Sequence, residues 1–280
     1  MNCILQMITI AFAAGSLGFA QDNTPEPFVE RARHATEKYK DRAAAIRDGY
    51  RLIGRDFPAM GEHWIHVGFL FDGEIDAARP EVLNYAAVSG LPQLLGVAYA
   101  LPLLKGEQPP DWPAGRDAWH DHFRSIEDET ALPQHHSAGY AADLPRLAML
   151  HAWIWVPNPA GMFAADNWAL SYFRLGLTIP EDMQTATAAK ALSLATGSAG
   201  YFLLRVEAAV NVTPAERSAI QAALERSRAQ VLALMDGQTG PSLTPQQLHD
   251  LSDVWRELRA AIDASLAEEK RHHLHHLFLR

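Results

Sequence analysis

The chain has 280 residues, of which 48% are hydrophobic, and it carries a formal net charge of -9. This composition predicts a folded protein with enough apolar surface for one large core or two modest cores, and it excludes an intrinsically disordered chain. The acidic balance argues against a nucleic-acid partner, because phosphate binding requires a concentrated face of Lys and Arg and the basic residues here are interleaved with acids.

Residues 1–20 are predicted to form a cleaved secretory signal peptide. The segment is apolar, ends with small residues at Gly18 and Ala20, and is followed at once by the polar sequence QDNTPEP. Because no Lys or Arg precedes the apolar stretch, an uncleaved N-terminal anchor is the alternative. No later segment is apolar enough to span a membrane, so we expect a periplasmic or secreted protein without a stable membrane span after cleavage.

The mature part of the chain contains no cysteine, since the single residue Cys3 lies within the signal segment. Disulfides and thiolate metal ligands are therefore excluded from the mature protein. Any metal ion has to be held by His, Asp, Glu or Tyr, and these ligands suit a divalent transition metal, with zinc or copper as the first choices.

The residue pattern predicts an α+β fold with a core domain at residues 21–175 and a helical region at residues 176–280. An amphipathic helix is expected from Pro27 to about Ile53, where apolar residues recur at helical spacing. Short runs rich in β-branched and aromatic residues then predict an antiparallel sheet, with strands at 63–70, 82–88, 94–100 and 147–156. Residues 105–143, rich in Gly and Pro, predict a long ordered loop.

The C-terminal region is predicted to contain helices at about 181–210, at 213–235 and from residue 244 onwards. The last two begin with strong start signals: Thr213 and Thr244 are each followed by Pro and then, three residues after the Thr, by Glu216 or Gln247. The glycines and proline of residues 237–241 predict the turn of a closing helical hairpin.

Histidines in the first strand region form one candidate metal cluster. If the segment is extended, Glu62 and His66 share one face and His63 lies on the other; if it begins with a turn, His63 and His66 converge instead. Glu62 is also the nearest sequence candidate for a general base. The plainer interpretation is that each histidine only hydrogen-bonds a nearby backbone group.

Two further histidine groups extend this hypothesis. In His120-Asp121-His122 an extended backbone places both imidazoles on one side, close enough to share an ion. His151 lies in a strongly apolar run, where a buried imidazole requires a metal, a carboxylate or a carbonyl as its partner. His135 and His136 are weaker candidates because adjacent residues of a strand point in opposite directions. His272 shares a face of the last helix with His276 or with His275, but these residues lie at a terminus, where preorganised sites are rare.

Several short motifs resemble a family of exported bacterial proteins without an assigned function. The matching pieces cover about residues 30–170 and are, in chain order, ATEKYKD with DGY, MGEHW, RPEVLNY, LGVAY, and HAWIW with NPAGMF. The resemblance singles out His63, Tyr85, Tyr99 and His151. This sequence departs from the family pattern at Ala98, where the family has Glu, so a role of that carboxylate is either missing here or filled by one of Glu62, Glu81, His120 and His122.

We therefore expect an exported protein that binds a divalent transition metal through histidines, with a metal-dependent enzyme as its catalytic version. The predicted ligands are His63, His66, His120, His122 and His151, and the expected partner is a metal ion or a small molecule. We expect His63 and His151 to lie on neighbouring strands and to face one interior. The alternative is a non-enzymatic binding module with an aromatic pocket or surface, because tryptophans are dense between residues 60 and 170. The residues expected in that pocket are Trp64, Tyr85, Tyr99 and Trp153.

Overall fold

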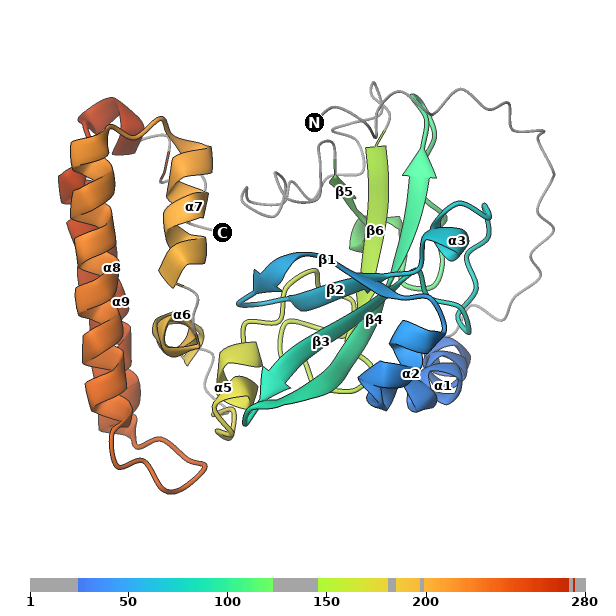
Figure 1. Cartoon of the computed structure of the whole chain (residues 1–280), viewed down its shortest axis with the longest axis horizontal. Helices are drawn as coiled ribbons and strands as arrows, with labels where there is room; N and C mark the ends of the chain where they lie inside the picture. Colours follow the sequence, from blue (N-terminus) through green and yellow to red (C-terminus); the bar gives the residue numbers. More distant parts are fainter. Residues whose placement is uncertain (1–24, 123–145, 181–184, 197–198, 272–273, 275–280) are drawn as a thin grey trace.

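The computed structural model describes residues 25–122, 146–180, 185–196, 199–271 and 274 (Figure 1). Within these residues the protein combines a six-stranded antiparallel sheet with a C-terminal group of helices, which confirms the predicted α+β class. The predicted signal peptide at residues 1–20 lies outside the described part of the chain.

The first predicted helix is interrupted and ends early. It is divided into α1 (Pro25–Thr36), the 3-10 helix η1 (Glu37–Lys40) and α2 (Arg42–Arg47). The break occurs at Asp41, whose carboxylate accepts a hydrogen bond from the amide of Ala43 and so begins a new helix. The predicted continuation to Ile53 was wrong, because that residue belongs to a strand.

The sheet is formed by strands from the middle of the chain. They are β1 (Arg51–Phe57), β2 (Gly61–Ile65), β3 (Val82–Val88), β4 (Leu91–Leu103), β5 (His120–His122) and β6 (Arg146–Ala152). Their order in the sheet is β1-β2-β3-β4-β6-β5, with every neighbouring pair antiparallel. The short helix α3 (Val67–Leu70) follows β2 and occupies part of the predicted first strand, and η2 (Arg116–Ala118) precedes β5.

The two faces of the sheet carry different cores. One face packs against the N-terminal helices, and the core between them contains most of the large aromatic side chains: Phe28, Tyr39 and Tyr50 from the N-terminal segment, and Trp64, Tyr85 and Tyr99 from the sheet. The other face carries smaller buried residues, among them Val82, Ala98, Ala100 and Met149. We call this second surface the histidine face, since His63 and His151 lie on it.

The C-terminal region begins with α5 (Leu170–Arg174), which connects it to the sheet. Leu170 packs in a cluster with sheet residues, and the guanidinium of Arg174 donates to both carboxylate oxygens of Asp56 in β1, at 2.7 and 2.5 Å. Helices α6 (Thr185–Ala195), α7 (Ala199–Ala209), α8 (Pro214–Met235) and α9 (Pro245–Ser265) follow. Their buried residues form a separate apolar cluster.

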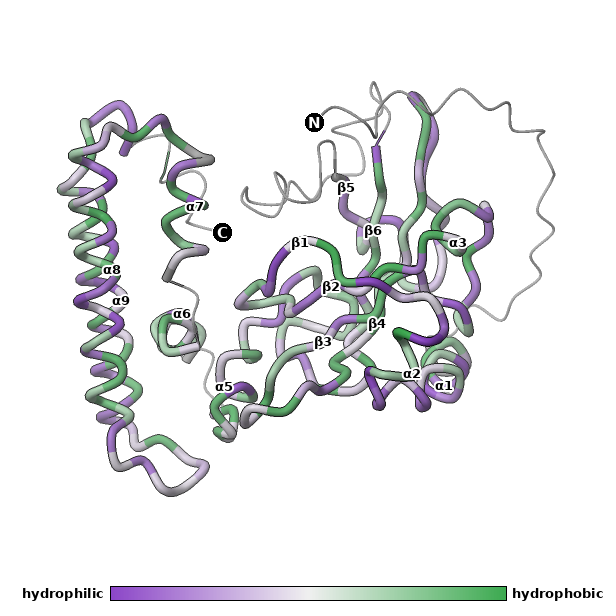
Figure 2. Tube along the Cα trace, viewed as in Figure 1, coloured by the Kyte–Doolittle hydropathy of each residue, from purple (hydrophilic) through white to green (hydrophobic). Residues whose placement is uncertain are grey.

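The predicted hairpin is confirmed at both of its start signals. Thr213 and Thr244 are the N-cap residues of α8 and α9, and each forms a complete capping box, with Glu216 and Gln247 respectively. Hydrophobic and hydrophilic residues alternate along both helices, as in amphipathic helices with one buried face (Figure 2). Among the helices of the described ranges, none combines the length and the apolar character that crossing a bilayer requires.

Candidate metal centre

Three buried imidazoles from three strands meet on the histidine face. His63 comes from β2, His120 from β5 and His151 from β6, and their side chains are 3%, 2% and 1% exposed. The ring centroid of His151 lies 5.4 Å from that of His63 and 5.3 Å from that of His120. His151 is therefore the central member of a cluster that we call the histidine triad.

The expectation that His63 and His151 occupy adjacent strands was wrong, although their side chains meet. Strands β3 and β4 separate β2 from β6. With strands about 4.8 Å apart, a flat sheet would place the two backbones about 14 Å from each other. The contact between the rings requires the sheet to curl towards the histidine face, and β1 and β2 run across β6 in Figure 1.

Small and polar residues of β3 and β4 occupy the sheet between the histidines. Asn84 is the cross-strand partner of His63, and Ala98 is the cross-strand partner of His151. Gly96 is the cross-strand partner of Asn84. Its lack of a side chain lets the backbone of Ala152 in β6 approach closely, since a Cβ at position 96 would lie 2.4 Å from the carbonyl oxygen of Ala152. The absence of a large side chain at position 98 lets the two imidazoles approach above β4.

Aromatic side chains border the triad. The ring of Phe57 lies 5.6 Å from that of His63, and it also contacts Tyr201 of α7, at 5.7 Å. The indole of Trp153 lies 5.9 Å from the ring of His151. These neighbours make the surroundings of the imidazoles apolar and shielded from solvent, conditions that strengthen electrostatic interactions at a site.

His120 is positioned by a strand of three residues that is anchored by a buried ion pair. The carboxylate of Asp121 lies 3.0 Å from Nε of Arg146 in β6, and the two side chains are 3% and 0% exposed. Arg146 also donates to the carbonyl oxygen of Glu107 at 2.7 Å. In the register of β5 and β6, Asp121 faces Ala148 while His120 faces Met149. The ion pair therefore lies on the opposite face of the sheet from His120, where it holds β5 against β6.

Glu62 and His66 do not lie with the triad. The carboxylate of Glu62 accepts a hydrogen bond from the indole of Trp64 at 2.9 Å and contacts Arg42 at 3.2 Å, on the face opposite His63. His66 is the N-cap of α3, where its Nδ1 accepts from the amide of Phe69 at 3.1 Å. The prediction that these two residues share a site with His63 has no support in this geometry, because strand alternation and the start of α3 direct them elsewhere.

The predicted aromatic pocket corresponds mainly to core packing. The hydroxyl of Tyr85 donates to the carbonyl oxygen of Tyr39, and that of Tyr99 donates to the carbonyl oxygen of Ala77. Both tyrosines are fully buried against the N-terminal helices, as is most of Trp64. Burial raises the pKa of the Tyr85 and Tyr99 hydroxyls well above the ordinary value, so both stay protonated. Only Trp153 of the four predicted residues borders the triad.

Other predicted histidines fall outside what the structure describes. His135 and His136 lie in the segment 123–145, and the side chain of His122 is likewise not described, although its backbone ends β5. The terminal histidines 272, 273, 275 and 276 are also outside. Their predicted contribution to metal binding stays a prediction.

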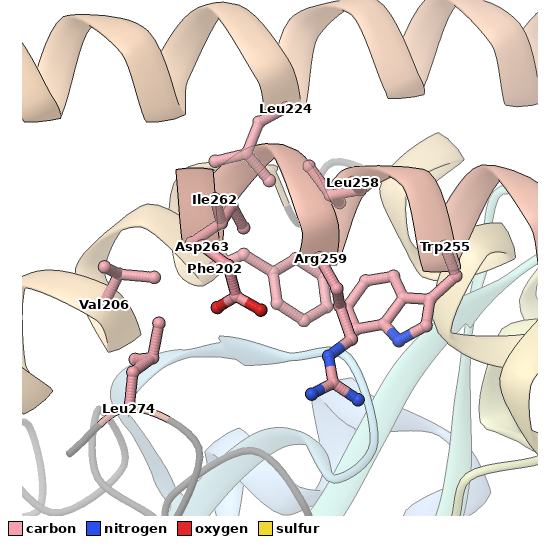
Figure 3. A pocket seen from close by; sticks show the side chains of 9 residues that line it. All are labelled: Phe202, Val206, Leu224, Trp255, Leu258, Arg259, Ile262, Asp263 and Leu274. Carbon is pink, nitrogen blue, oxygen red and sulfur yellow. The ribbon is translucent and has the colours of Figure 1, made fainter. Parts of the chain in front are cut away.

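A separate apolar pocket lies between α7, α8 and α9. Phe202, Trp255 and Leu258 form much of its lining, which also includes the charged side chains of Arg259 and Asp263 (Figure 3). None of the residues predicted for an aromatic pocket contributes to it. The pocket belongs to the apolar cluster of the helical region rather than to the histidine face.

Sequence reasoning missed Asn84 as a site residue. Its side chain is 1% exposed and is adjacent in register to His63. The sequence signal that could have found it is a carboxamide in the otherwise apolar run Val82–Val88, since a buried polar group in such a strand needs a partner.

Comparison of the chain with protein-family models, with curated proteins and with solved structures finds no match.

Proposed function

We propose that the protein binds one divalent transition-metal ion, zinc or copper, through His63, His120 and His151. The observation that carries this proposal is the meeting of three buried imidazoles from β2, β5 and β6 on one face of the sheet. Imidazole nitrogens are preferred ligands of zinc and copper, and three protein ligands are typical of sites that keep one position open.

The separations of the His151 ring from the rings of His63 and His120 fit imidazoles that share an ion. A ligand nitrogen lies about 2.1 Å from zinc and about 1.1 Å from the centroid of its own ring, so two imidazoles at a tetrahedral angle have centroids about 5.2 Å apart. The two measured separations in the triad are 5.4 and 5.3 Å.

The side chains have to rotate before they can coordinate. Within the described residues, no three His, Cys, Asp or Glu side chains are already arranged to hold an ion. The planes of His63 and His151 are inclined by 69°, and those of His120 and His151 by 43°. Rotation about χ1 and χ2 is the expected adjustment, because the ring of His151 already lies at a suitable distance from the rings of His63 and His120.

The donor set supports metal binding more directly than it supports a particular reaction. Glu62, the predicted general base, is held by Trp64 and Arg42 on the opposite face. A catalytic version of the site would need a general base other than Glu62, or a bound ligand that itself accepts the proton. We therefore propose a metal-binding protein and leave Glu62 out of the site.

Export to the periplasm or the cell exterior is part of the same proposal. It is supported by the apolar residues 1–20 with their small terminal residues, and by the absence of cysteine from the rest of the sequence. A histidine-only ligand set does not depend on the redox state of thiols, which suits an oxidising compartment.

Titration of the metal-free protein with zinc tests the proposed function. We expect one ion per chain, with binding lost when His63 and His151 are both replaced by Ala. An exposed pair, His34 and His249, provides the matched control because its replacement removes the same number of imidazoles from the surface.

A further inference from the structure

Asn84 is a buried carboxamide whose polar atoms are not satisfied by the protein. Its side chain is 1% exposed, and neither Nδ2 nor Oδ1 has a hydrogen-bond partner among the described residues. Asn158 and Asn167 differ from it, because in each of them Nδ2 donates to a carbonyl oxygen and Oδ1 accepts from a backbone amide. Asn84 thus differs from Asn167, the other buried asparagine of the described residues, and from the half-buried Asn158.

Leaving such a group unpaired is costly. Burial of a donor or acceptor without a hydrogen bond costs about 1–3 kcal/mol, whereas an apolar side chain of similar size at the same position costs nothing of this kind. Buried polar groups without a hydrogen-bond partner are rare in folded proteins, so each one needs a specific explanation. Hydrogen bonding to a bound ligand is one such explanation. The neighbours of Asn84 indicate which ligand site is involved.

The position of Asn84 places it at the histidine triad. Asn84 and His63 are direct cross-strand partners, so their side chains leave the sheet on the same face with Cβ atoms about 5 Å apart. The ring of His63 in turn contacts that of His151. The carboxamide therefore stands beside the imidazoles, on the concave side of the curled sheet.

We propose that Asn84 is a ligand-binding residue of the histidine site, where its carboxamide holds a small organic molecule that coordinates the same ion. The inference rests on the proposed metal binding. Because both ends of the carboxamide are unpaired, the fitting ligand carries an acceptor for Nδ2 and a donor for Oδ1 next to a metal-coordinating oxygen. Small amides, hydroxamates and hydroxy acids have this arrangement, whereas a simple carboxylate offers acceptors only.

Acetohydroxamate and acetate are suitable probes, because the first offers both a donor and acceptors and the second offers acceptors alone. Calorimetric titration of each probe into the zinc-loaded protein compares wild type with Asn84→Leu, and with Asn84→Ser in case the larger change prevents folding. We expect both variants to bind zinc within threefold of wild type. We expect them to bind acetohydroxamate at least about tenfold more weakly, which corresponds to the loss of one or two hydrogen bonds, and to lose less affinity for acetate, which can only accept the one bond from Nδ2.

Asn158→Leu is the matched control, because it removes a carboxamide whose bonds are satisfied within its own loop. It should destabilise the fold and leave acetohydroxamate affinity unchanged. Equal acetohydroxamate affinity in wild type and both Asn84 variants, with zinc bound in all of them, overturns the role of Asn84 alone. A wild-type protein that binds no zinc overturns the proposed function and this inference together.

Discussion

The imidazole rings of His63 and His151 lie with centroids 5.4 Å apart, although two strands of the sheet separate β2 from β6. The curl of the sheet brings them together, and Ala98, with its small side chain, lies in the cross-strand row of His151. Ala98 is the direct cross-strand partner of His151, so any side chain at this position enters the space beside the triad. Position 98 thus falls within the candidate site.

An acidic side chain at position 98 should make stability dependent on metal. In Ala98→Asp without metal, we expect a loss of about 2–4 kcal/mol in the free energy of unfolding, since the carboxyl is buried without a charged partner. Zinc should restore more stability to this variant than to wild type, because the carboxylate gains an ion to coordinate. Thermal unfolding with and without zinc measures both effects.

The control for this prediction is Ala32→Asp, which buries the same group beneath the opposite face of the sheet. It should be destabilised to a similar extent and gain no more from zinc than wild type does. If zinc rescues Ala32→Asp as well as Ala98→Asp, position 98 has no special relation to the ion.

The buried ion pair of Asp121 and Arg146 should be required to position His120. Asp121→Ala leaves the fully buried guanidinium of Arg146 without its carboxylate, a change that typically costs about 3–5 kcal/mol. We expect weaker zinc binding as well, because β5 is only three residues long and loses its anchor to β6. Chemical denaturation and zinc titration provide the two readouts.

The double variant Asp121→Leu with Arg146→Met separates charge from position. Replacing both partners by apolar residues avoids the uncompensated charge, so much of the stability should return. If zinc affinity returns with it, packing alone positions His120. If stability returns and zinc affinity stays low, the ion pair itself orients the strand, and this is the result we expect.

Glu81 should make the protein less stable as the pH rises towards alkaline values. Burial raises the pKa of its carboxyl to about 8, from an ordinary value of 4.5, even though the carboxylate accepts a hydrogen bond from the amide of Ala100. Because the folded state binds this proton more tightly than the unfolded state, the stabilising contribution is fully present below pH 4.5 and is lost progressively up to about pH 8.

Urea unfolding at pH 6 and pH 9 tests this contribution by comparing wild type with Glu81→Gln. The variant keeps a neutral side chain of the same shape, so its stability should fall less between the two pH values than that of wild type, by an amount of order 1–3 kcal/mol. Identical pH dependence in the two proteins would show that the Glu81 carboxyl does not titrate in this range.

The elements that could be predicted from sequence are those specified by local signals. The starts of α8 and α9 follow from Thr213 and Thr244, whose capping boxes depend only on residues within one helical turn. Strand β3 was predicted at its exact bounds from a continuous apolar run. Strand β1 was missed because it is an exposed edge strand without alternating burial, so its residues resembled the end of the preceding helix.

The meeting of the histidines was predicted only in part, because it depends on contacts distant in sequence. Strand character correctly indicated that His63 and His151 face one interior, and the sheet order that separates their strands has no local signal. His66 was misassigned because the turn into α3 begins at this residue, where its side chain caps the helix. Asn84 was overlooked because a single polar residue within an apolar strand does not identify its partner.

Zinc titration of the metal-free protein, monitored by calorimetry, tests the central claim most directly. We predict binding of one ion per chain with a dissociation constant below about 1 μM, as expected for three neighbouring imidazoles that need only side-chain rotation to share the ion. Binding should weaken at least 100-fold in the His63→Ala/His151→Ala variant and remain unchanged in the His34→Ala/His249→Ala variant. Equal zinc binding by all three proteins, or no binding by wild type, would contradict the assignment of the histidine triad as a metal site.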